Sequence, residues 1–201
     1  MIDKIFSNIR KKLDVKNDIR EEVYSNSRKI IHKCGEGIKY VHSGDYEKVI
    51  EYIEKIRKLI DELIEQIKNK DQEFLYNNNI KVMYQEFAEL AIFYNIITKD
   101  KIVSPKDLGI PVSPYLTGLG DVVGELRRYS LDSVRNEDIE SAEKSLNWME
   151  SIYENLSSLN YPSGLVHNLR HKTDVARSLV EKTRANVTLS WVMLKHGEKK
   201  E

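Results

Sequence analysis

The chain has 201 residues, with 32 Lys or Arg side chains, 32 Asp or Glu side chains and a formal net charge of zero. Hydrophobic residues make up 40% and charged residues 32%, a composition typical of a helix-rich globular protein. The single cysteine, Cys34, excludes an intramolecular disulfide framework and a Cys-based zinc site, and we interpret it as a buried apolar residue.

Apolar residues recur every three or four positions along nearly the whole chain, which predicts helices. The first helix is predicted from residue 2 to about 41, and its apolar stripe begins with Ile2, Ile5, Phe6, Ile9 and Leu13. A turn at 42–45, where Ser43 or Asp45 can cap a helix, leads to a second helix that ends near residue 70. A third helix is predicted from about 73 to 98.

Prolines mark the next segment, 102–113, as a connection with room for a short helix at 105–108. Ser113 and Pro114 predict an N-cap followed by proline at the first position of a fourth long helix, which ends near residue 130. A fifth runs from 136–138 to about 159, and the last follows a break at 160–164 and ends near 195. No alternation typical of strands is present, so the predicted fold class is all-α.

We expect a single domain, 1–201, with a flexible tail at 196–201. We expect no secretory leader, because amphipathic spacing starts at residue 2, and the longest apolar run, at 90–94, is far too short to cross a membrane. These features predict a cytoplasmic protein with no membrane partner.

Two pairs of carboxylates are candidates for a functional site. Glu86 and Glu89 are three residues apart in the third predicted helix, and Asp121 and Glu125 are four apart in the fourth. Each spacing places both carboxylates on one helix face, where like charges repel. Two such pairs can form one site for a hard divalent cation, which takes oxygen ligands and supports the hydrolysis of phosphate esters.

The competing interpretation is that these pairs lie on solvated helix faces, as we expect for two other pairs, Glu51–Glu54 and Asp61–Glu65. Val82 and Phe93 flank the pair on the third helix, so at least partial shielding from water is expected there. Three glycines, Gly118, Gly120 and Gly124, adjoin the other pair. They permit close helix packing or close approach of a ligand, and the sequence leaves both open.

Basic residues concentrate toward the two ends of the chain. Residues 1–33 carry nine Lys or Arg against five Asp or Glu, and residues 160–201 carry eight against four. This distribution suits binding of a polyanion, although ordinary solvated helix faces would produce it too. The candidate phosphate-binding residues are Arg20, Lys81, Arg127, Arg128, Arg170, Lys172, Arg177 and Arg184. Arg127 or Arg128 could also compensate the acidic pair before them. His167 and His171, four apart, suit a surface or RNA-contact role better than a metal site.

Several stretches resemble the translin and Trax family. They are YLTGLGDVVGELRR at 115–128, SLDSVRNEDI at 130–139, DIREEV at 18–23 and the final helix from 169 to 184. The resemblance implies a subunit of about seven helices in a translin-like helical bundle. Such subunits assemble into a hollow octamer that binds single-stranded RNA and DNA. The lysine- and isoleucine-rich composition suits a prokaryotic, archaeal member.

The family contains a catalytic type and a binding type. Trax is a Mg²⁺-dependent endoribonuclease that uses two glutamates of one helix and an Asp and a Glu of another, whereas translin departs from that set. By resemblance, the matching residues here are Glu86, Glu89, Asp121 and Glu125, while the compact length and the DIREEV segment look like translin.

The sequence therefore favours a Mg²⁺- or Mn²⁺-dependent endoribonuclease that acts on single-stranded RNA as a homo-oligomer. Sequence-tolerant binding is assigned to Arg20, Lys81, Arg127, Arg128, Arg170 and Lys172. The main alternative is a non-catalytic, translin-like particle that binds single-stranded RNA or DNA. An all-α nucleotide pyrophosphatase and a helical scaffold without ligand are further alternatives.

Overall fold

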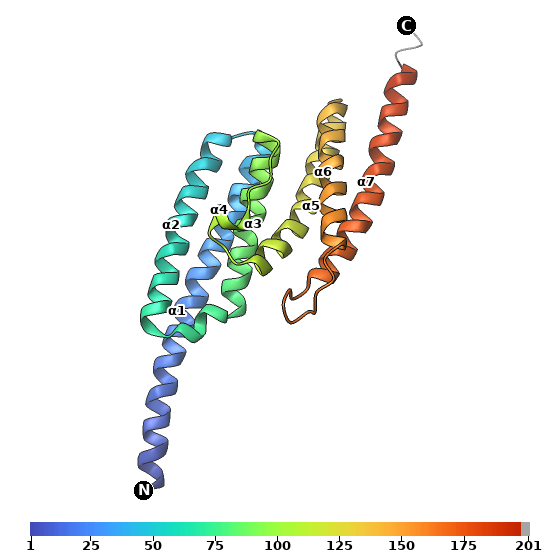
Figure 1. Cartoon of the computed structure of the whole chain (residues 1–201). Helices are drawn as coiled ribbons and strands as arrows, with labels where there is room; N and C mark the ends of the chain where they lie inside the picture. Colours follow the sequence, from blue (N-terminus) through green and yellow to red (C-terminus); the bar gives the residue numbers. More distant parts are fainter. Residues whose placement is uncertain (198–201) are drawn as a thin grey trace.

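The computed structural model describes the backbone of residues 1–197 and side chains up to residue 194. Within this part the chain forms seven α-helices and one short 3₁₀ helix, with no strand (Figure 1). They are α1 (Ile2–Ser43), α2 (Tyr46–Lys70), η1 (Gln72–Tyr76), α3 (Asn78–Lys99), α4 (Pro105–Leu108), α5 (Val112–Arg135), α6 (Ile139–Ser157) and α7 (Leu169–Gly197). The prediction of an all-α fold is confirmed. Of the tail predicted at 196–201, residues 196 and 197 continue α7, and residues 198–201 lie outside the described residues.

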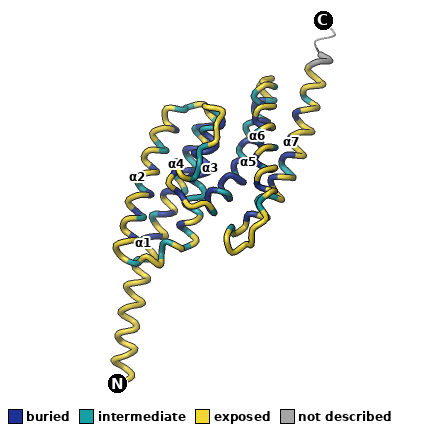
Figure 2. The backbone as a smooth tube through the Cα atoms, viewed as in Figure 1, coloured by how far each residue is buried: buried dark blue, intermediate teal, exposed yellow. Residues whose placement is uncertain are grey.

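Helices α3 and α5 form the centre of the fold. Helix α3 packs against α1 and α5, helix α5 also packs against α6 and α7, and α2 packs on α1. Buried residues accordingly gather along α3 and α5 in Figure 2. The two acidic pairs predicted from the sequence therefore lie on neighbouring central helices.

The apolar stripes explain this burial. Phe87 and Leu90 of α3 and Val122 and Leu126 of α5 have at most 1% of their surface exposed. Each such side chain contributes roughly 1.5–3 kcal/mol through removal from water. This core holds the backbone of α3 and α5 together, so it can hold acidic side chains close to one another despite their repulsion. Cys34 is also fully buried, as expected.

Helix boundaries differ from the prediction at four places. The expected third helix is split at Asn77, whose side chain caps α3 by accepting from the amide of Asn79 at 2.9 Å. Helix α5 starts at Val112, two residues before Pro114. Pro114 is tolerated inside the first turn, because the amides of that turn have no acceptor within the helix and the proline therefore removes no hydrogen bond. It also continues five residues past the expected end, and α7 begins at Leu169 rather than directly after the break at 160–164.

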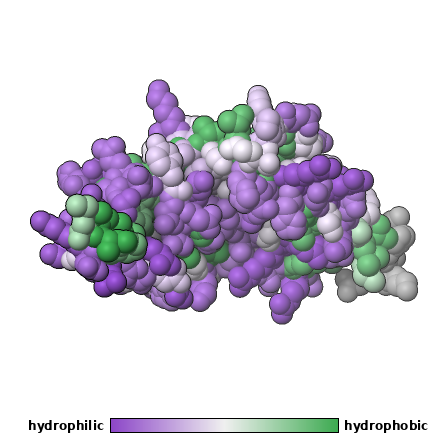
Figure 3. Space-filling view, turned by 90° about the horizontal axis from the view of Figure 1, so that it is seen from below, coloured by the Kyte–Doolittle hydropathy of each residue, from purple (hydrophilic) through white to green (hydrophobic). Residues whose placement is uncertain are grey.

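Both ends of the helical array project beyond the core. Residues 1–18 are all exposed, so the apolar stripe at the start of α1 has no covering element in the described part of the chain. Phe6 is 51% exposed and Ile2 is 65% exposed. At the other end of the chain, Leu189 and Met193 of α7 are also exposed. Figure 3 shows hydrophobic surface near both ends of a mostly hydrophilic face.

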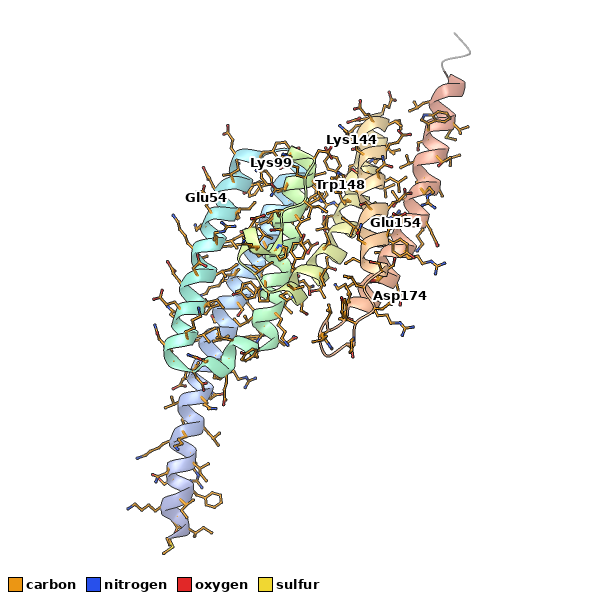
Figure 4. The ribbon with its side chains drawn as sticks, in the orientation of Figure 1. Glu54, Lys99, Lys144, Trp148, Glu154 and Asp174 are labelled. Atoms are coloured by element: carbon orange, nitrogen blue, oxygen red, sulfur yellow. The ribbon has the colours of Figure 1, made fainter. Side chains whose placement is uncertain are left out.

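One hydrogen bond joins α6 to the residue that ends α3. The indole Nε1 of Trp148, on α6, donates to Asp100 Oδ1 at 2.7 Å, and Trp148 is labelled beside the end of α3 in Figure 4. Asp100 ends α3 in a left-handed conformation, with φ of 51°.

Among residues 1–197, no helix combines the length and apolar character needed to cross a membrane.

Candidate functional site

The carboxylates of α3 are shielded from water. Glu89 is 9% exposed and Glu86 is half-buried. Phe93, one turn beyond Glu89, is fully buried, in line with the shielding expected from the sequence. No ion pair or side-chain hydrogen bond within the described part of the chain engages either glutamate. An ionised carboxylate in such a position is costly unless a cation or a proton compensates it.

The carboxylates of α5 have partners from three other helices. Lys172 Nζ of α7 donates to Asp121 Oδ1 at 2.5 Å, and Gln85 Nε2 of α3 donates to Asp121 Oδ2 at 2.7 Å. His42 Nε2 of α1 lies within hydrogen-bonding distance of Glu125 Oε2, at 2.6 Å. The side chain of His42 is 7% exposed. Both α5 carboxylates are thus held by nitrogen donors of the protein itself.

Aromatic packing fixes the orientation of His42. Its ring centroid lies 5.0 Å from that of Phe93 and 6.5 Å from that of Tyr129. The imidazole therefore presents its Nε2 to Glu125 from an apolar setting. A buried polar group in such a setting depends strongly on its hydrogen-bond partner.

The glycines of α5 position these partners. A Cβ at Gly118 would lie 2.5 Å from the backbone oxygen of Gln85, so α3 and α5 touch where Gln85 meets Asp121. A Cβ at Gly120 would lie 2.9 Å from the Cβ of Lys172, so α7 also approaches α5 at the same level. Gly124 has open space beside it. Close packing therefore accounts for Gly118 and Gly120, and only Gly124 retains room for a ligand.

The four carboxylates act on one another, and we call Glu86, Glu89, Asp121 and Glu125 the acidic cluster. Burial raises the pKa of the Glu89 carboxyl to about 9, and the charges of Asp121, Glu86 and Glu125 act in the same direction. Burial also raises the pKa of Glu86, again with a contribution from Asp121. Lys172 opposes both shifts. The α3 and α5 pairs are therefore close enough for substantial electrostatic coupling.

The donor set suits a hard divalent cation, because carboxylate oxygens are the ligands that Mg²⁺ prefers and the buried Glu89 has no ion-pair partner within the described residues. The described side chains do not converge on a common point. Nowhere in residues 1–194 are three or more His, Cys, Asp or Glu side chains arranged so as to hold a metal ion. Oxygens of Asp121 and Glu125 are instead taken up by protein donors.

The predicted phosphate-binding residues fall into two groups. Four are exposed and form no ion pair within the described residues: Arg20, Lys81, Arg128 and Arg170. The others have protein partners. Arg127 donates to Thr183 Oγ1 at 2.8 Å, so it does not compensate Glu125, and Lys172 holds Asp121. Arg177 pairs with Glu181 at 3.1 Å and Arg184 with Glu150 at 2.7 Å.

The two histidines considered from the sequence are both exposed. His167 precedes the start of α7, so it and His171 do not share a helix face. The structure places neither of them in a metal-binding group.

Comparison with known proteins identifies the family. The family model of the Translin family matches residues 14–187. The chain belongs to the Translin family. It is 33% identical over 178 residues to the uncharacterized protein MJ0175 of Methanocaldococcus jannaschii, covering 86% of this chain and 76% of that protein.

Solved structures show the same translin-like fold. The AfC3PO–duplex RNA complex has 30% identity and a TM-score of 0.81, covering 94% of this chain and 97% of that chain. AfC3PO alone has 31% identity and the same TM-score over the same shares. Apo-NeC3PO has 24% identity and a TM-score of 0.79, covering 92% of this chain and 96% of that chain, and shows the fold alone.

Within this Translin-family fold, sequence reasoning missed three contacts of the acidic cluster. The sequence pattern places His42 in a turn, indicates no role for Gln85 and indicates phosphate binding for Lys172. The spacing of residues within one helix carries no information about partners from other helices. The close approach that Gly118 and Gly120 permit was the one available signal.

Proposed function

We propose that the chain is a metal-dependent endoribonuclease that cleaves single-stranded RNA, with its acidic cluster holding Mg²⁺ or Mn²⁺. The observation that supports this most is the packing of α3 on α5, which joins the two acidic pairs through the Gln85–Asp121 hydrogen bond of 2.7 Å and leaves Glu89 buried. Membership of the Translin family and the likeness to a C3PO–RNA complex support RNA as the ligand. That complex contains duplex RNA, so the strand requirement is part of what must be tested.

The chain's own groups divide the work of such a reaction. A bound divalent cation supplies Lewis acidity and a more acidic water. Asp121 and Glu125 bring negative charge from one helix and Glu89 from the other. Glu86, the more exposed carboxylate of α3 with a pKa raised by burial, is suited to accept a proton from the attacking water.

Exposed basic side chains would hold the RNA backbone. Arg20, Lys81, Arg128 and Arg170 have no ion-pair partner in the described residues, so their charges are available to phosphates. Arg127 and Lys172 are engaged within the fold and would need to change partner to do the same.

The proposed assembly is a homo-oligomer, an octamer by family resemblance. The projecting apolar stripe of α1 supports self-association, because large exposed apolar surfaces are typical of interfaces. Ile9→Asp should lower the particle mass in light scattering coupled to gel filtration, while Asn8→Asp, an exposed polar neighbour, should not. An unchanged mass in Ile9→Asp would exclude this part of the stripe as an interface.

The catalytic proposal is tested with Asp121→Ala and Glu125→Ala on single-stranded and duplex RNA with Mg²⁺. Both variants should lose cleavage while still binding RNA. Glu54→Ala is the matched control, since Glu54 is an exposed carboxylate of α2 that points away from the bundle (Figure 4). Undiminished cleavage in both site variants would remove the proposal.

A non-catalytic RNA-binding particle is the second candidate. It is favoured by one observation, that Lys172 and His42 already satisfy the α5 carboxylates without a metal ion. It predicts salt-dependent RNA binding by the unmodified protein and no turnover with Mg²⁺ or Mn²⁺. Release of pyrophosphate from nucleoside triphosphates would instead indicate a pyrophosphatase.

A further inference from the structure

Lys172 lies inside the acidic cluster and not on the open surface. Its ammonium group and the side-chain amide of Gln85 together engage both oxygens of Asp121. The side chains of Lys172 and Asp121 are each 21% exposed, so solvent screens this ion pair only partly. A lysine at the protein surface that binds only phosphate would have no need of such a position.

The charge of Lys172 extends beyond Asp121. It favours the ionised forms of Glu86 and Glu89 on α3, against the effect of their burial. His42 of α1 provides the corresponding contact for Glu125. Lys172 therefore acts as the counter-charge for three members of the acidic cluster when no metal ion is present.

The fold holds the stem of Lys172 and leaves its end adaptable. Gly120 allows the Cβ of Lys172 to pack directly on α5, which fixes where the side chain starts. Beyond that point a lysine has a flexible four-carbon stem with a compact charge at its tip. The ammonium group can therefore leave Asp121 without any movement of α7.

We propose that Lys172 is an internal, displaceable cation, which compensates the acidic cluster in the metal-free protein and is displaced from Asp121 when a divalent cation binds. The inference rests on the proposed function, because it takes the acidic cluster to be a metal site. It assigns Lys172 a positioning role that lowers the apparent metal affinity while keeping the metal-free site stable.

The test measures Mn²⁺ binding by calorimetry and thermal unfolding in EDTA, both without RNA. Lys172→Gln keeps a hydrogen-bond donor but loses the charge, so it should bind Mn²⁺ about tenfold more tightly, the effect of losing one charge-assisted contact. It should also unfold at a lower temperature in EDTA. Lys172→Arg, which keeps the charge, should bind Mn²⁺ more weakly than Lys172→Gln does. Lys182→Gln, at an exposed lysine of the same helix, should bind Mn²⁺ as the unmodified protein does.

Equal or weaker Mn²⁺ binding by Lys172→Gln would overturn the inference. If the unmodified protein and every variant fail to bind Mn²⁺ or Mg²⁺, the proposed metal site itself is wrong. Crystal structures of the unmodified protein with and without Mn²⁺ provide a test that requires no variant to fold. A Lys172–Asp121 contact broken in the Mn²⁺ form supports the displacement, and a contact retained beside bound Mn²⁺ excludes it.

Discussion

Replacing Glu89 by glutamine should remove a pH-dependent loss of stability from the metal-free protein. Burial and three neighbouring carboxylates raise the pKa of Glu89 from 4.5 to about 9 in the folded state. The folded protein therefore binds this proton more tightly than the unfolded chain does. Stability is highest below the unfolded pKa, falls as the pH rises from about 4.5 to about 9, and levels off above that range.

The size of the effect follows from the shift. Each pKa unit corresponds to about 1.36 kcal/mol, so the full shift amounts to roughly 6 kcal/mol of lost stability at high pH. Glutamine has nearly the shape of the protonated acid and cannot ionise. Glu89→Gln should therefore match the unmodified protein near pH 5 and exceed it by several kcal/mol near pH 9.

Urea unfolding followed by circular dichroism in EDTA, between pH 5 and pH 9 at one protein concentration, measures this difference. The comparison between variant and parent cancels groups that titrate equally in both. Glu54→Gln is the control, because Glu54 is exposed on α2 and should show no pH-dependent difference. If the advantage of Glu89→Gln does not grow with pH, the site is not the shielded acidic environment described above.

Three further outcomes are expected. Gly118→Ala should destabilise the fold by about 1–3 kcal/mol, because its Cβ would meet a backbone oxygen of α3 at 2.5 Å. Gly124→Ala has open space and should be neutral or stabilising by up to about 1 kcal/mol. Thermal unfolding compares the two variants, and equal effects would contradict the packing argument. His42→Phe retains ring packing but leaves Glu125 without the contact to Nε2, so the free energy of unfolding in EDTA should fall by about 1–3 kcal/mol. An unchanged value would show that this contact contributes nothing to stability. Arg128→Gln should weaken RNA binding and reduce the slope of log binding constant against log salt concentration by roughly 0.7–0.9, as expected for one lost phosphate contact. Arg184→Gln should leave both unchanged, because Arg184 is already held in an ion pair at 2.7 Å. Fluorescence anisotropy at several salt concentrations distinguishes the two variants.

Local pattern was sufficient for most of the helices. The all-α class follows from apolar spacing alone, and α2 ends at Lys70 as predicted. The short helix α4 begins at Pro105, again as predicted, because proline fixes a helical φ and needs no amide partner in the first turn. The misplaced boundaries at Asn77 and Leu169 lie in segments without a single dominant signal, where several polar residues can each end a helix.

The sequence by itself determined which carboxylates stand in pairs. The spacing of Glu86 and Glu89, and of Asp121 and Glu125, is set by the chain and by helix geometry. Only the tertiary structure decided that these pairs interact across α3 and α5 while Lys172 and His42 occupy the α5 side. The physical reason is that helix periodicity orients side chains around one axis, whereas contacts between helices depend on packing that residues distant in the chain determine together.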